Sequence, residues 1–416
     1  MKTEIKFCIR CLYASTHPLG LTFNEKNICS GCLIHEEKNT LDWQHRWNKL
    51  LKLTNEYKSK SKNIYDCIIP ITGAHDSHYI VYIVKEKLKL NPLLVCYNKY
   101  YNTSVGIKNI SNLRIKFNCD VLFQNVNPIS VKKITRNTLI DFGSIYWHVL
   151  AGHSVFPVQI SIKYKIPLII WGAHQGLEQV GMYSHLNEVE MTRRYRKDHD
   201  LLGIEAENLV KQYNDLNEGD IFQYLYPEDM DLKKNGTRGI YLGNYIRWDP
   251  KKQHEEMIRL YDYKTSGFNR TMDCYDYVDC FNYMNLHDLL KLYKHGYSKV
   301  TDHLSREIRF GRIDRNKALK LTRFYEKKNI LYKELFCNWL NINKNSLNFI
   351  LNKFRNKKFW IQRDVDSWTF NGLSKKNFVK KNFASKKISK KLLFISNSEK
   401  KKDKKNYIIY GKGMEL

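Results

Sequence analysis

The stretch that decides the fold is Tyr65–Ile71, YDCIIPI, followed at once by residues 72–77, TGAHDS. The first part is apolar like a buried strand, and the amphipathic run from His78 to Lys89 predicts a helix. A strand, a glycine turn and a helix start rich in small and hydroxyl-bearing residues together form a typical phosphate-binding loop of parallel α/β proteins. The alternative is an ordinary strand-to-helix turn, in which Asp76 and Ser77 only cap the helix.

Strands and helices alternate on both sides of this loop across residues 64–235. Apolar runs predict further strands at 93–97, 120–123 and 167–171, and amphipathic runs predict helices at 104–117, 131–142 and 155–164. This order indicates an α/β fold with a doubly wound parallel sheet, which binds its ligands at the carboxyl ends of the strands. Residues 72–77 and 172–181 both follow predicted strands, so we expect both at that edge of the sheet.

The N-terminus carries two CxxC pairs, Cys8 with Cys11 and Cys29 with Cys32. Each pair can present two thiolates to one ion, and four thiolates complete a tetrahedral zinc site. A segment this short buries too little core to fold by itself, so the metal would supply its folding free energy. Four sulfur ligands leave no open position, which makes the expected zinc structural. His17 and His35 could replace a cysteine as ligands, but we expect both at the surface.

Composition favours a cytoplasmic globular protein. The 416 residues are 43% hydrophobic and carry a net charge of +28. No apolar run approaches the roughly 20 residues of a membrane span, and the N-terminus lacks the apolar core of a signal peptide. Residues 374–416 hold 14 lysines and three acidic residues. We interpret the charge as compositional background plus a solvated tail, and contact of the tail with an anionic membrane surface or with nucleic acid is the alternative.

Five parts follow along the chain. They are a zinc-ribbon-like module (1–36), a connecting helix and linker (37–63, with the helix at 41–58), an α/β domain (64–235), a mainly helical C-terminal domain (236–370) and a lysine-rich flexible tail (371–416). Within the C-terminal domain, periodicity predicts a strand-like run at 241–246 and helices at 252–261, 276–293, 301–310, 315–327 and 347–354.

The chain from about residue 6 to about residue 360 resembles the N-acetyl sugar amidotransferases of surface-polysaccharide biosynthesis, which are PP-loop ATP pyrophosphatases. The TGAHDS loop is similar to the SGGxDS signature of that superfamily. Besides the cysteine pairs, the resemblance rests on Leu41–Trp43, Tyr65–Ser77, Thr103–Asn109, Phe156–Val158, Lys165–Gly172, Leu242–Pro250 and Thr301–Arg309. The chain departs from the family at Ala74 (usually glycine), His75 (usually lysine), Ala173 and His174 (usually an acid after Gly172) and Val180 (usually glycine).

The resemblance implies an ATP-dependent amidotransferase that converts the acetamido group of a nucleotide sugar to acetamidino, for lipopolysaccharide, O-antigen or another surface glycan. ATP, Mg²⁺ and structural zinc are the implied cofactors. The residues implied to bind the nucleotide are Thr72, Gly73, Ala74, His75, Asp76, Ser77, Trp171 and Gly172, and of these His75, Asp76 and Ser77 are also implied to be catalytic. No glutaminase motif is visible, so the implied ammonia source is a separate glutamine amidotransferase, similar to the pair that makes imidazole glycerol phosphate.

His75 is the departure with a direct chemical consequence. An imidazole with its ordinary pKa of about 6.5 donates to a phosphate only when it is protonated or in the right tautomer. We therefore expect activity to depend on pH between about 6 and about 8. A lysine at this position would stay charged throughout that range.

The implied substrate residues are Glu178, Gly181, Asp302, His303, Arg306 and Glu307. Glu178 and Gly181 match a family stretch that follows the fourth predicted strand. On the predicted helix 301–310, Asp302 and Arg306 are four residues apart, as are His303 and Glu307, so each pair shares a face. Either these are two intrahelical ion pairs on a solvated surface, or Arg306 contacts a phosphate or carboxylate of the substrate. The basic run Arg193–Lys197 also has two interpretations, binding of a diphosphate or a partner, and a solvated face.

Two other classes of function stay open. One is a PP-loop enzyme that modifies tRNA, for which the positive charge would be suitable. We disfavour nucleic acid as the partner because much of the charge lies in the tail, outside the core. The other is a non-catalytic binding subunit whose variant loop no longer turns over ATP.

Deletion of residues 374–416 should leave the melting temperature within a few degrees of that of the whole chain, because a segment so rich in lysine contributes little to a core. Thermal unfolding of the two proteins, followed by circular dichroism, measures this. A truncated protein that no longer folds would make the segment an integral part of the structure.

Overall fold

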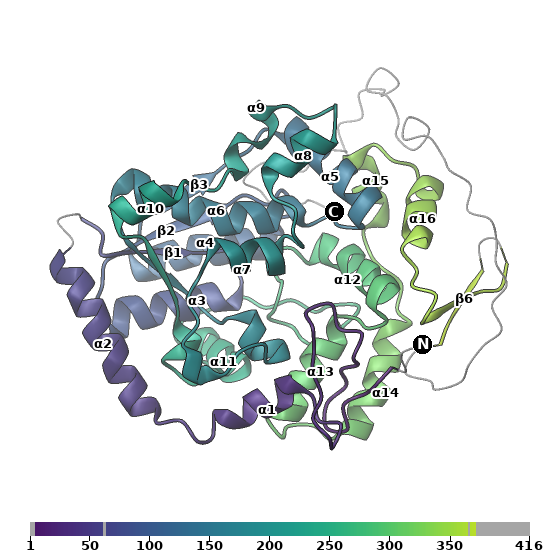
Figure 1. Cartoon of the computed structure of the whole chain (residues 1–416), viewed down its shortest axis with the longest axis horizontal. Helices are drawn as coiled ribbons and strands as arrows, with labels where there is room; N and C mark the ends of the chain where they lie inside the picture. The colour runs from purple at the N-terminus through teal and green to yellow at the C-terminus, as the bar shows by residue number, and fades with distance from the viewer. Residues whose placement is uncertain (1–4, 61–63, 365–366, 372–416) are drawn as a thin grey trace.

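A five-stranded parallel sheet with the order β3-β2-β1-β4-β5 forms the centre of the computed structural model, which describes residues 5–60, 64–364 and 367–371 (Figure 1). The strands are β1 (Cys67–Pro70), β2 (Pro92–Tyr97), β3 (Val121–Gln124), β4 (Leu168–Trp171) and β5 (Arg238–Tyr241). The predicted doubly wound α/β fold is confirmed, and β1 to β4 begin and end within two residues of their predicted bounds. The predicted tail, apart from Asn371, lies outside the described residues.

Helices cover both faces of the sheet because successive strand residues point to opposite sides. Ile69 of β1 packs with residues of α3 (His75–Tyr82), α4 (Ser104–Phe117) and α11 (Pro250–Tyr261). Ile68, its neighbour in sequence, packs on the other face with α6 (Trp147–Tyr164). The sheet is therefore the middle layer of an α/β/α sandwich.

Helix starts follow local capping chemistry. The Thr103 side chain accepts a hydrogen bond from the Gly106 N–H at the start of α4, and Asp249 accepts one from the Lys252 N–H at the start of α11. α3 is shorter than the predicted helix, because the chain continues from Ile83 to Lys87 as a π-helix.

Helix α6 is longer than the sequence predicts, since it begins at Trp147 and not at residue 155. Pro157 lies inside it and cannot donate a backbone hydrogen bond there. Packing stabilises the helix on both sides of the proline. Val155 and Val158 pack against the sheet, and Trp147 packs in a second hydrophobic cluster with residues of the C-terminal helices. α5 (Pro128–Phe142) likewise begins three residues before its predicted start.

Short elements connect β4 to β5. They are π-helices at Gly176–Val180 and Arg196–Asp200, 3-10 helices at His185–Asn187 and Phe222–Tyr224, and the helices α7 (Arg193–Tyr195), α8 (Ala206–Gln212), α9 (Glu218–Ile221) and α10 (Asp229–Asn235). β5 pairs with β4 and is followed by a 3-10 turn, Leu242–Asn244, where the sequence predicts a strand-like run. The sheet thus extends past residue 235, which the sequence predicts as the end of the α/β domain.

The C-terminal part is mainly helical, as predicted. Its helices after α11 are α12 (Phe281–His295), α13 (Lys299–Arg309), α14 (Arg315–Glu326), α15 (Lys333–Leu340) and α16 (Lys344–Lys353). An antiparallel hairpin, β6 (Trp360–Gln362) with β7 (Trp368–Phe370), follows, and the sequence predicts neither this hairpin nor α15. One hydrophobic cluster joins α5 and α6 to α12, α15 and α16, so the core is continuous across residue 235.

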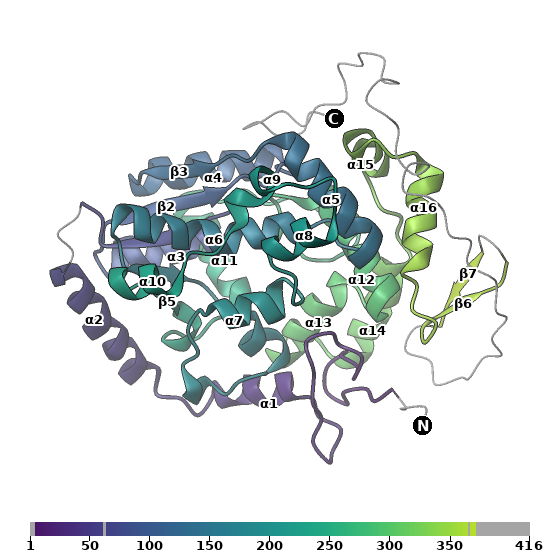
Figure 2. The same cartoon turned by 45° about the horizontal axis from the view of Figure 1, so that its top comes forward.

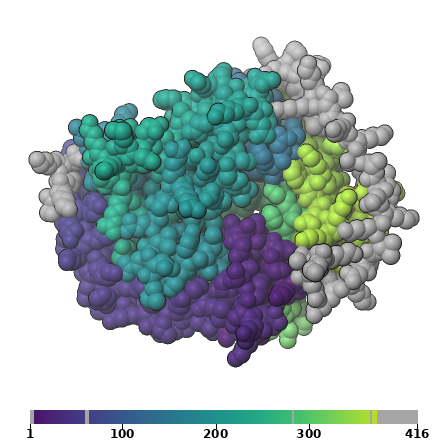
Figure 3. Space-filling view, viewed as in Figure 1, coloured from purple at the N-terminus to yellow at the C-terminus, as the bar shows by residue number. Residues whose placement is uncertain are grey.

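The N-terminal segment contains the cysteine pairs, α1 (Ser30–Glu37) and α2 (Trp43–Lys60). In Figures 1 and 2 its first residues lie against α13 and α14, and Leu12 packs with Val300, Leu304 and Ala318 of those helices. Figure 3 shows the N-terminal residues in purple along the edge of this face, below the teal middle of the chain.

Candidate functional site

The candidate site lies where the chain changes direction across the sheet. β1 and β4 are neighbours, but the chain leaves β1 towards β2 and returns to β4 from β3 on the far side of the sheet. Such a switch point leaves a crevice at the carboxyl ends of the two strands, which is where open α/β sheets bind ligands. The loop 72–77 follows β1 and the segment 172–181 follows β4, so both predicted segments lie beside that point.

The loop 72–77 is built around Gly73, whose φ of +85° is a conformation that other residues rarely adopt. A β-carbon on Gly73 would lie 2.6 Å from the backbone oxygen of Gly106. The Ser77 hydroxyl accepts a hydrogen bond from the Thr72 N–H at 2.9 Å, and the Thr72 hydroxyl accepts one from the Ala74 N–H at 3.2 Å. Ala74 occupies the N-cap position, so neither Asp76 nor Ser77 is the N-cap of α3. The Ser77 N–H donates to the Ala74 oxygen at 3.2 Å, and the preceding N–H groups lie at the start of the helix, where N–H groups in general can receive an anion.

His75 is buried, and its two ring nitrogens face two carboxylates. Nε2 lies 2.6 Å from Asp76 Oδ1, and Nδ1 lies 3.0 Å from Asp276 Oδ1. Tyr275 and His254 stand edge-on to the ring, with centroids 5.1 and 6.4 Å away. Burial opposes a charge on His75, but Asp76 and Asp276 outweigh it and raise its pKa to about 10.

This environment changes the expectation for pH. With a pKa of about 10, His75 carries its charge throughout the range between about pH 6 and about pH 8, so the ordinary imidazole titration does not fall there. Burial lowers the pKa of the neighbouring His254 to about 4, so that ring is neutral in the same range. A lysine in place of His75 should therefore leave the shape of the pH profile unchanged, contrary to what the sequence indicates.

A set of charged side chains from the C-terminal part surrounds Asp276. Its second oxygen, Oδ2, lies 3.1 Å from His303 Nε2 and 3.3 Å from Arg306 Nη1. Arg306 also pairs with Asp273 at 2.9 Å, and Thr271 Oγ1 lies 2.6 Å from His303 Nδ1. Asp273, Asp276 and His303 offer three metal-ligand atoms within 4.8 Å of one another. Because the Arg306 guanidinium already balances both carboxylates, we interpret this cluster as an ion-pair network and assign no metal to it.

Both intrahelical pairs predicted on α13 are wrong, and so is the solvated surface. Asp302 accepts a hydrogen bond from the Tyr13 hydroxyl at 2.8 Å and pairs with Lys291 of α12. Glu307 pairs with Arg306 at 3.0 Å and with Arg312 at 3.3 Å. Asp302, His303 and Glu307 are all buried, because α13 lies between other elements. Their partners come partly from α13 itself, as in the pairs Lys299–Asp302 and Arg306–Glu307, and partly from other elements.

The residues after β4 divide between the loop and the N-terminal segment. Gly172 has no room for a side chain, since a β-carbon would lie 2.9 Å from Trp248. Glu178 binds Lys38, with 2.5 Å between Oε2 and the Nζ of that almost fully buried lysine. Gly181 has a φ of +63°, and its β-carbon would lie 2.5 Å from the Ser30 oxygen. The structure thus places Glu178 and Gly181 against the N-terminal segment, while Trp171 and Gly172 stand at the end of β4.

The four predicted metal ligands meet in one buried cluster. The Sγ atoms of Cys8 and Cys32 are 3.9 Å apart, those of Cys11 and Cys29 are 3.5 Å apart, and all four lie within 4.8 Å of one another. The N–H groups of Cys11 and Cys29 both point at the Cys8 sulfur, at 3.4 Å. Four thiolates at these separations can enclose one metal ion.

Arg309 joins this cluster to the segment after β4. Its Nη2 lies 3.8 Å from the Cys29 sulfur and 4.0 Å from the Cys11 sulfur, and its Nη1 donates to the backbone oxygens of Glu178 and Gln179. Burial opposes the charge of Arg309, but the neighbouring thiol groups, that of Cys11 foremost, hold its pKa well above the ordinary value. A cation beside four thiolates offsets their negative charge and orients them.

The expected surface position of His17 and His35 is wrong. Both are buried, and neither belongs to the group of four metal-ligand atoms. His17 stacks on Tyr297 with ring centroids 5.0 Å apart, and His35 meets Phe310 edge-on at 4.6 Å. Burial lowers the pKa of each to about 3, so both are neutral aromatic packing residues.

Four residues of the site have no signal in the sequence that singles them out. Asp273 and Asp276 lie in an irregular segment, and the prediction that Asp276 begins a helix is wrong, because α12 begins at Phe281. Lys38 resembles any other lysine of a lysine-rich chain. Arg309 lies at the end of the stretch Thr301–Arg309 that carries the family resemblance, which is the one indication of its importance.

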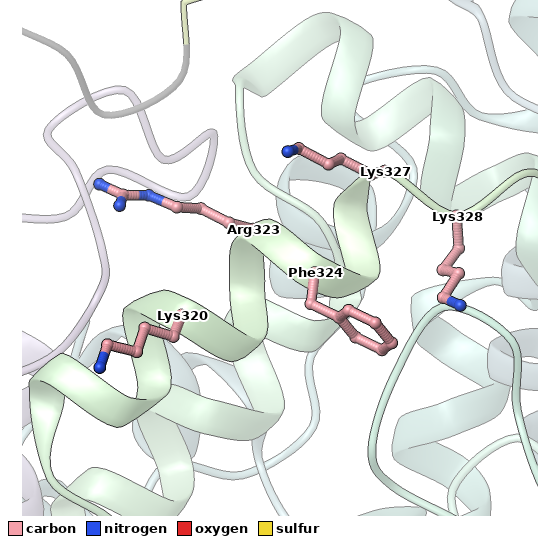
Figure 4. Close-up of a pocket in the computed structure, with 5 residues that line it drawn as sticks. All are labelled: Lys320, Arg323, Phe324, Lys327 and Lys328. Atoms are coloured by element: carbon pink, nitrogen blue, oxygen red, sulfur yellow. The ribbon is translucent and has the colours of Figure 1, made fainter.

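Two other groups of basic side chains, the run Arg193–Lys197 and a group at α14, differ in whether their charges are paired with acids. Within the run Arg193–Lys197, Arg193 and Arg196 both pair with Glu205, and Arg196 is buried, so these two do not form a free basic surface. A pocket of about 500 Å³ on α14 does present cations (Figure 4). It is lined by Lys320, Arg323, Phe324, Lys327 and Lys328, and the Lys328 ammonium lies 4.4 Å from the centre of the Phe324 ring.

Among the described helices, none is both long enough and apolar enough to cross a bilayer.

Comparison with known proteins supports one part of the resemblance directly. Residues 254–374 match a family model described as the C-terminal domain of WbpG-like LPS biosynthesis proteins. The likeness to surface-polysaccharide enzymes is thereby confirmed for this region. The chain is also 29% identical over 121 residues to an uncharacterised protein of Methanocaldococcus jannaschii. That match covers 28% of this chain and 42% of the relative, so the chain spans less than half of the relative's length.

Solved structures with some likeness are an NH₃-dependent NAD synthetase from Campylobacter jejuni, an NMN synthetase from Francisella tularensis and a U34-tRNA thiolase with a [4Fe-4S] cluster from Methanococcus maripaludis. Their sequence identities are 14%, 12% and 15%, and their TM-scores are 0.28, 0.28 and 0.29. The matches cover 45%, 53% and 80% of this chain and 80%, 95% and 92% of the other chains. Likenesses at this level carry no argument about the reaction.

Replacement of His75 by glutamine should lower the free energy of unfolding by an amount that depends on pH. The folded-state pKa of about 10 exceeds the ordinary value of 6.5, so the stabilisation from the charged ring is complete below about pH 6.5 and is lost as the pH rises towards 10. The difference between wild type and His75→Gln, measured by urea unfolding, should therefore shrink between about pH 6.5 and about pH 10.

His78→Gln is the matched control for this measurement, since it lies one turn further along α3. Burial lowers the pKa of His78 to about 3, so that ring is neutral throughout the same range. The destabilisation by His78→Gln should stay constant between about pH 6.5 and about pH 10. A constant difference for His75→Gln as well would contradict the assignment of a charged His75.

Proposed function

We propose that this protein is an ATP-dependent amidotransferase that converts the acetamido group of a nucleotide sugar to an acetamidino group, for lipopolysaccharide or another surface glycan. The observation that carries the proposal is the meeting of two segments in one place. A loop able to hold phosphates lies at the switch point of the sheet, and a domain matching WbpG-like LPS biosynthesis proteins reaches that loop through Asp276.

The reaction needs ATP because an amide carbonyl is a poor electrophile and oxide is a poor leaving group. In the first step the amide oxygen attacks the α-phosphorus of ATP, an O–P bond forms, and pyrophosphate leaves. In the second step ammonia attacks the activated carbon, the C–O bond breaks, and AMP departs with the former amide oxygen. The net change on the sugar replaces oxygen by NH.

The loop residues would bind and orient the triphosphate. N–H groups at the start of α3 would hold phosphate oxygens, with the charge of His75 close to them. The Ser77 hydroxyl keeps the loop in shape through its bond to the Thr72 N–H. Asp76, whose side chain is 43% exposed, has one oxygen directed at His75 and would hold Mg²⁺ with the other. An Mg²⁺ ion held by Asp76 would neutralise the charge of the phosphates.

Zinc suits the cysteine cluster by geometry. A tetrahedral ion with Zn–S bonds of about 2.3 Å places its sulfur ligands about 3.8 Å apart. The two separations given above, 3.5 and 3.9 Å, lie on either side of that value. Cys8, Cys11, Cys29 and Cys32 would hold the ion, and its chemistry would be structural, because four protein ligands leave no position for a substrate.

The proposed partners follow from the reaction. The nucleotide sugar would enter at the carboxyl edge of the sheet, and ammonia would come from a separate glutamine amidotransferase pair. The proposed site of action is the cytoplasm, where ATP and nucleotide sugars are available. The cations of α14 and the lysine-rich residues 374–416 would allow contact with an anionic membrane surface.

Purified protein should contain about one zinc ion per chain, because the four sulfurs match a single tetrahedral ion. Cys29→Ser should lose the metal and most of its solubility, since the N-terminal segment depends on the ion for its folding. Plasma mass spectrometry of the protein after gel filtration measures the metal. Cys274→Ser is the matched control, because Cys274 is exposed and lies outside the cluster. Iron in place of zinc, or a stable protein without metal, would contradict the assignment.

With ATP, Mg²⁺, concentrated ammonium and an N-acetylated nucleotide sugar, the protein should release AMP and pyrophosphate and lower the mass of the sugar by about one unit. Asp76→Ala and Ser77→Ala should each reduce this activity at least about 100-fold, because one removes a ligand of Mg²⁺ and the other the hydroxyl that shapes the loop. Mass spectrometry of the sugar and an assay of pyrophosphate measure both products.

The substitution Ser266→Ala, at a half-buried position outside the loop, serves as the control for that assay. Unchanged activity of Asp76→Ala would place the chemistry elsewhere in the molecule. Turnover of tRNA without turnover of any sugar in a panel of substrates would replace the proposal by the tRNA-modifying class. Binding of ATP without release of pyrophosphate would indicate a binding subunit.

A further inference from the structure

The segment 271–279, which connects α11 to α12, lies across the ends of two strands of the sheet. At one end, Asp276 contacts His75 of the loop after β1. At the other end, Asp279 pairs with Lys99, which follows β2, and its backbone oxygen accepts from the Thr103 N–H at 3.2 Å. A β-carbon on Gly106 would lie 2.5 Å from the Asp279 Cα, so the segment is in close contact with α4 as well. The segment belongs to the WbpG-like region, and it covers the carboxyl edge at β1 and β2.

The contact between Asp276 and His75 is enclosed. The side chain of His75 is 5% exposed and that of Asp276 is 16% exposed, so water screens their attraction poorly. Behind Asp276 stand His303 and Arg306 of α13, which fix its second oxygen. Asp276 is therefore held from one side by α13 and presents its other oxygen to the phosphate loop.

Loss of His75 would leave Asp276 paired with His303 and Arg306 of α13 but no longer in contact with the phosphate loop. Loss of Asp276 would leave Asp76 as the carboxylate that contacts His75 among the described residues, and Asp76 is also the residue that we expect to hold Mg²⁺. If the Asp76 carboxylate alone balanced the charge of His75, His75 would compete with Mg²⁺ for that carboxylate. The ion pair with Asp276 thus frees Asp76 for its role in the nucleotide site.

We propose that Asp276 is a positioning residue of the nucleotide site, and that its ion pair with His75 fastens the phosphate loop to the WbpG-like domain in the shape that binds the triphosphate of ATP. This inference rests on the proposed function for the identity of the nucleotide. The pair joins residues 201 positions apart in the sequence, so the loop is complete only when the C-terminal domain is in place.

Titration calorimetry of the full-length, zinc-loaded protein with Mg·ATP tests the proposal. Asp276→Asn and His75→Gln should each weaken ATP binding at least about tenfold, because each removes the ion pair that joins the phosphate loop to the segment 271–279. The double variant should bind ATP no more weakly than the weaker single variant, since both substitutions remove the same interaction. Asp276→Glu keeps the charge and should recover binding to within about threefold of wild type.

Asp288→Asn is the control for the loss of a buried ion pair that does not touch the loop. Asp288 is 2% exposed and pairs with Arg270 at 2.7 Å. Its replacement should lower the melting temperature and leave the dissociation constant for ATP unchanged. The activity assay adds a second readout: Asp276→Asn should raise the KM for ATP by more than it lowers kcat, whereas a merely destabilised protein would recover full affinity when cooled.

The outcomes distinguish a failure of the positioning role of Asp276 from a failure of the proposed function. Wild type that binds ATP, with Asp276→Asn binding equally well, overturns the positioning role and leaves the proposed function intact. Additive effects in the double variant overturn it too. Wild type that binds no ATP overturns the proposed function and this inference with it. If Asp276→Asn does not fold, as judged by circular dichroism, Asp276→Glu and His75→Gln decide between the same results.

Discussion

The arrangement of this molecule depends on one buried, charged helix. α13 carries Asp302, His303 and Glu307 into the interior, where an unbalanced charge costs several kcal/mol. Lys299 and Arg306 of the same helix match part of this charge, and other parts of the chain match the rest. Tyr13 and the cysteine cluster meet α13 on one side, and the segment 271–279 meets it on the other. These pairings fix the positions of the N-terminal segment, the C-terminal helices and the carboxyl edge of the sheet relative to one another.

The proposed nucleotide site depends on that arrangement. Arg309 binds the backbone of the segment after β4, and Arg306 and His303 hold Asp276 against the loop after β1. Both segments flank the switch point of the sheet, so one helix positions both of them. Arg309 contacts both the cysteine sulfurs and the segment after β4. A metal ion bound by the cysteines would therefore help to fix the position of that segment through Arg309.

The elements that the sequence predicts well are those with a strong local pattern. β1 to β4 are short apolar runs bounded by turns, and α4 is predicted at its observed bounds because Thr103 caps it and a left-handed Asn118 ends it. α15, the hairpin of β6 and β7 and the short helices between β4 and β5 were not predicted. They are short, and contacts with longer helices support several of them: α15 packs on α5 and α12, α9 on α5, α10 on α6, and Trp360 of the hairpin on Leu292 of α12. Packing also extends α6 across Pro157, against the local preference.

The sequence by itself determined which chemistry is available: four cysteines at metal-binding spacing, a glycine turn after a buried strand, and acids and arginines on one helix. It could also place the two strand-end segments at one edge, because parallel strands share the direction of their carboxyl ends. Only the tertiary structure decided the partners. Asp302 faces Lys291 and Tyr13 and not Arg306. His75 faces Asp276 as well as its sequence neighbour Asp76, and the two carboxylates together raise its pKa. Charge pairing in a core acts across space, through burial and distance, and neither quantity is present in residue spacing.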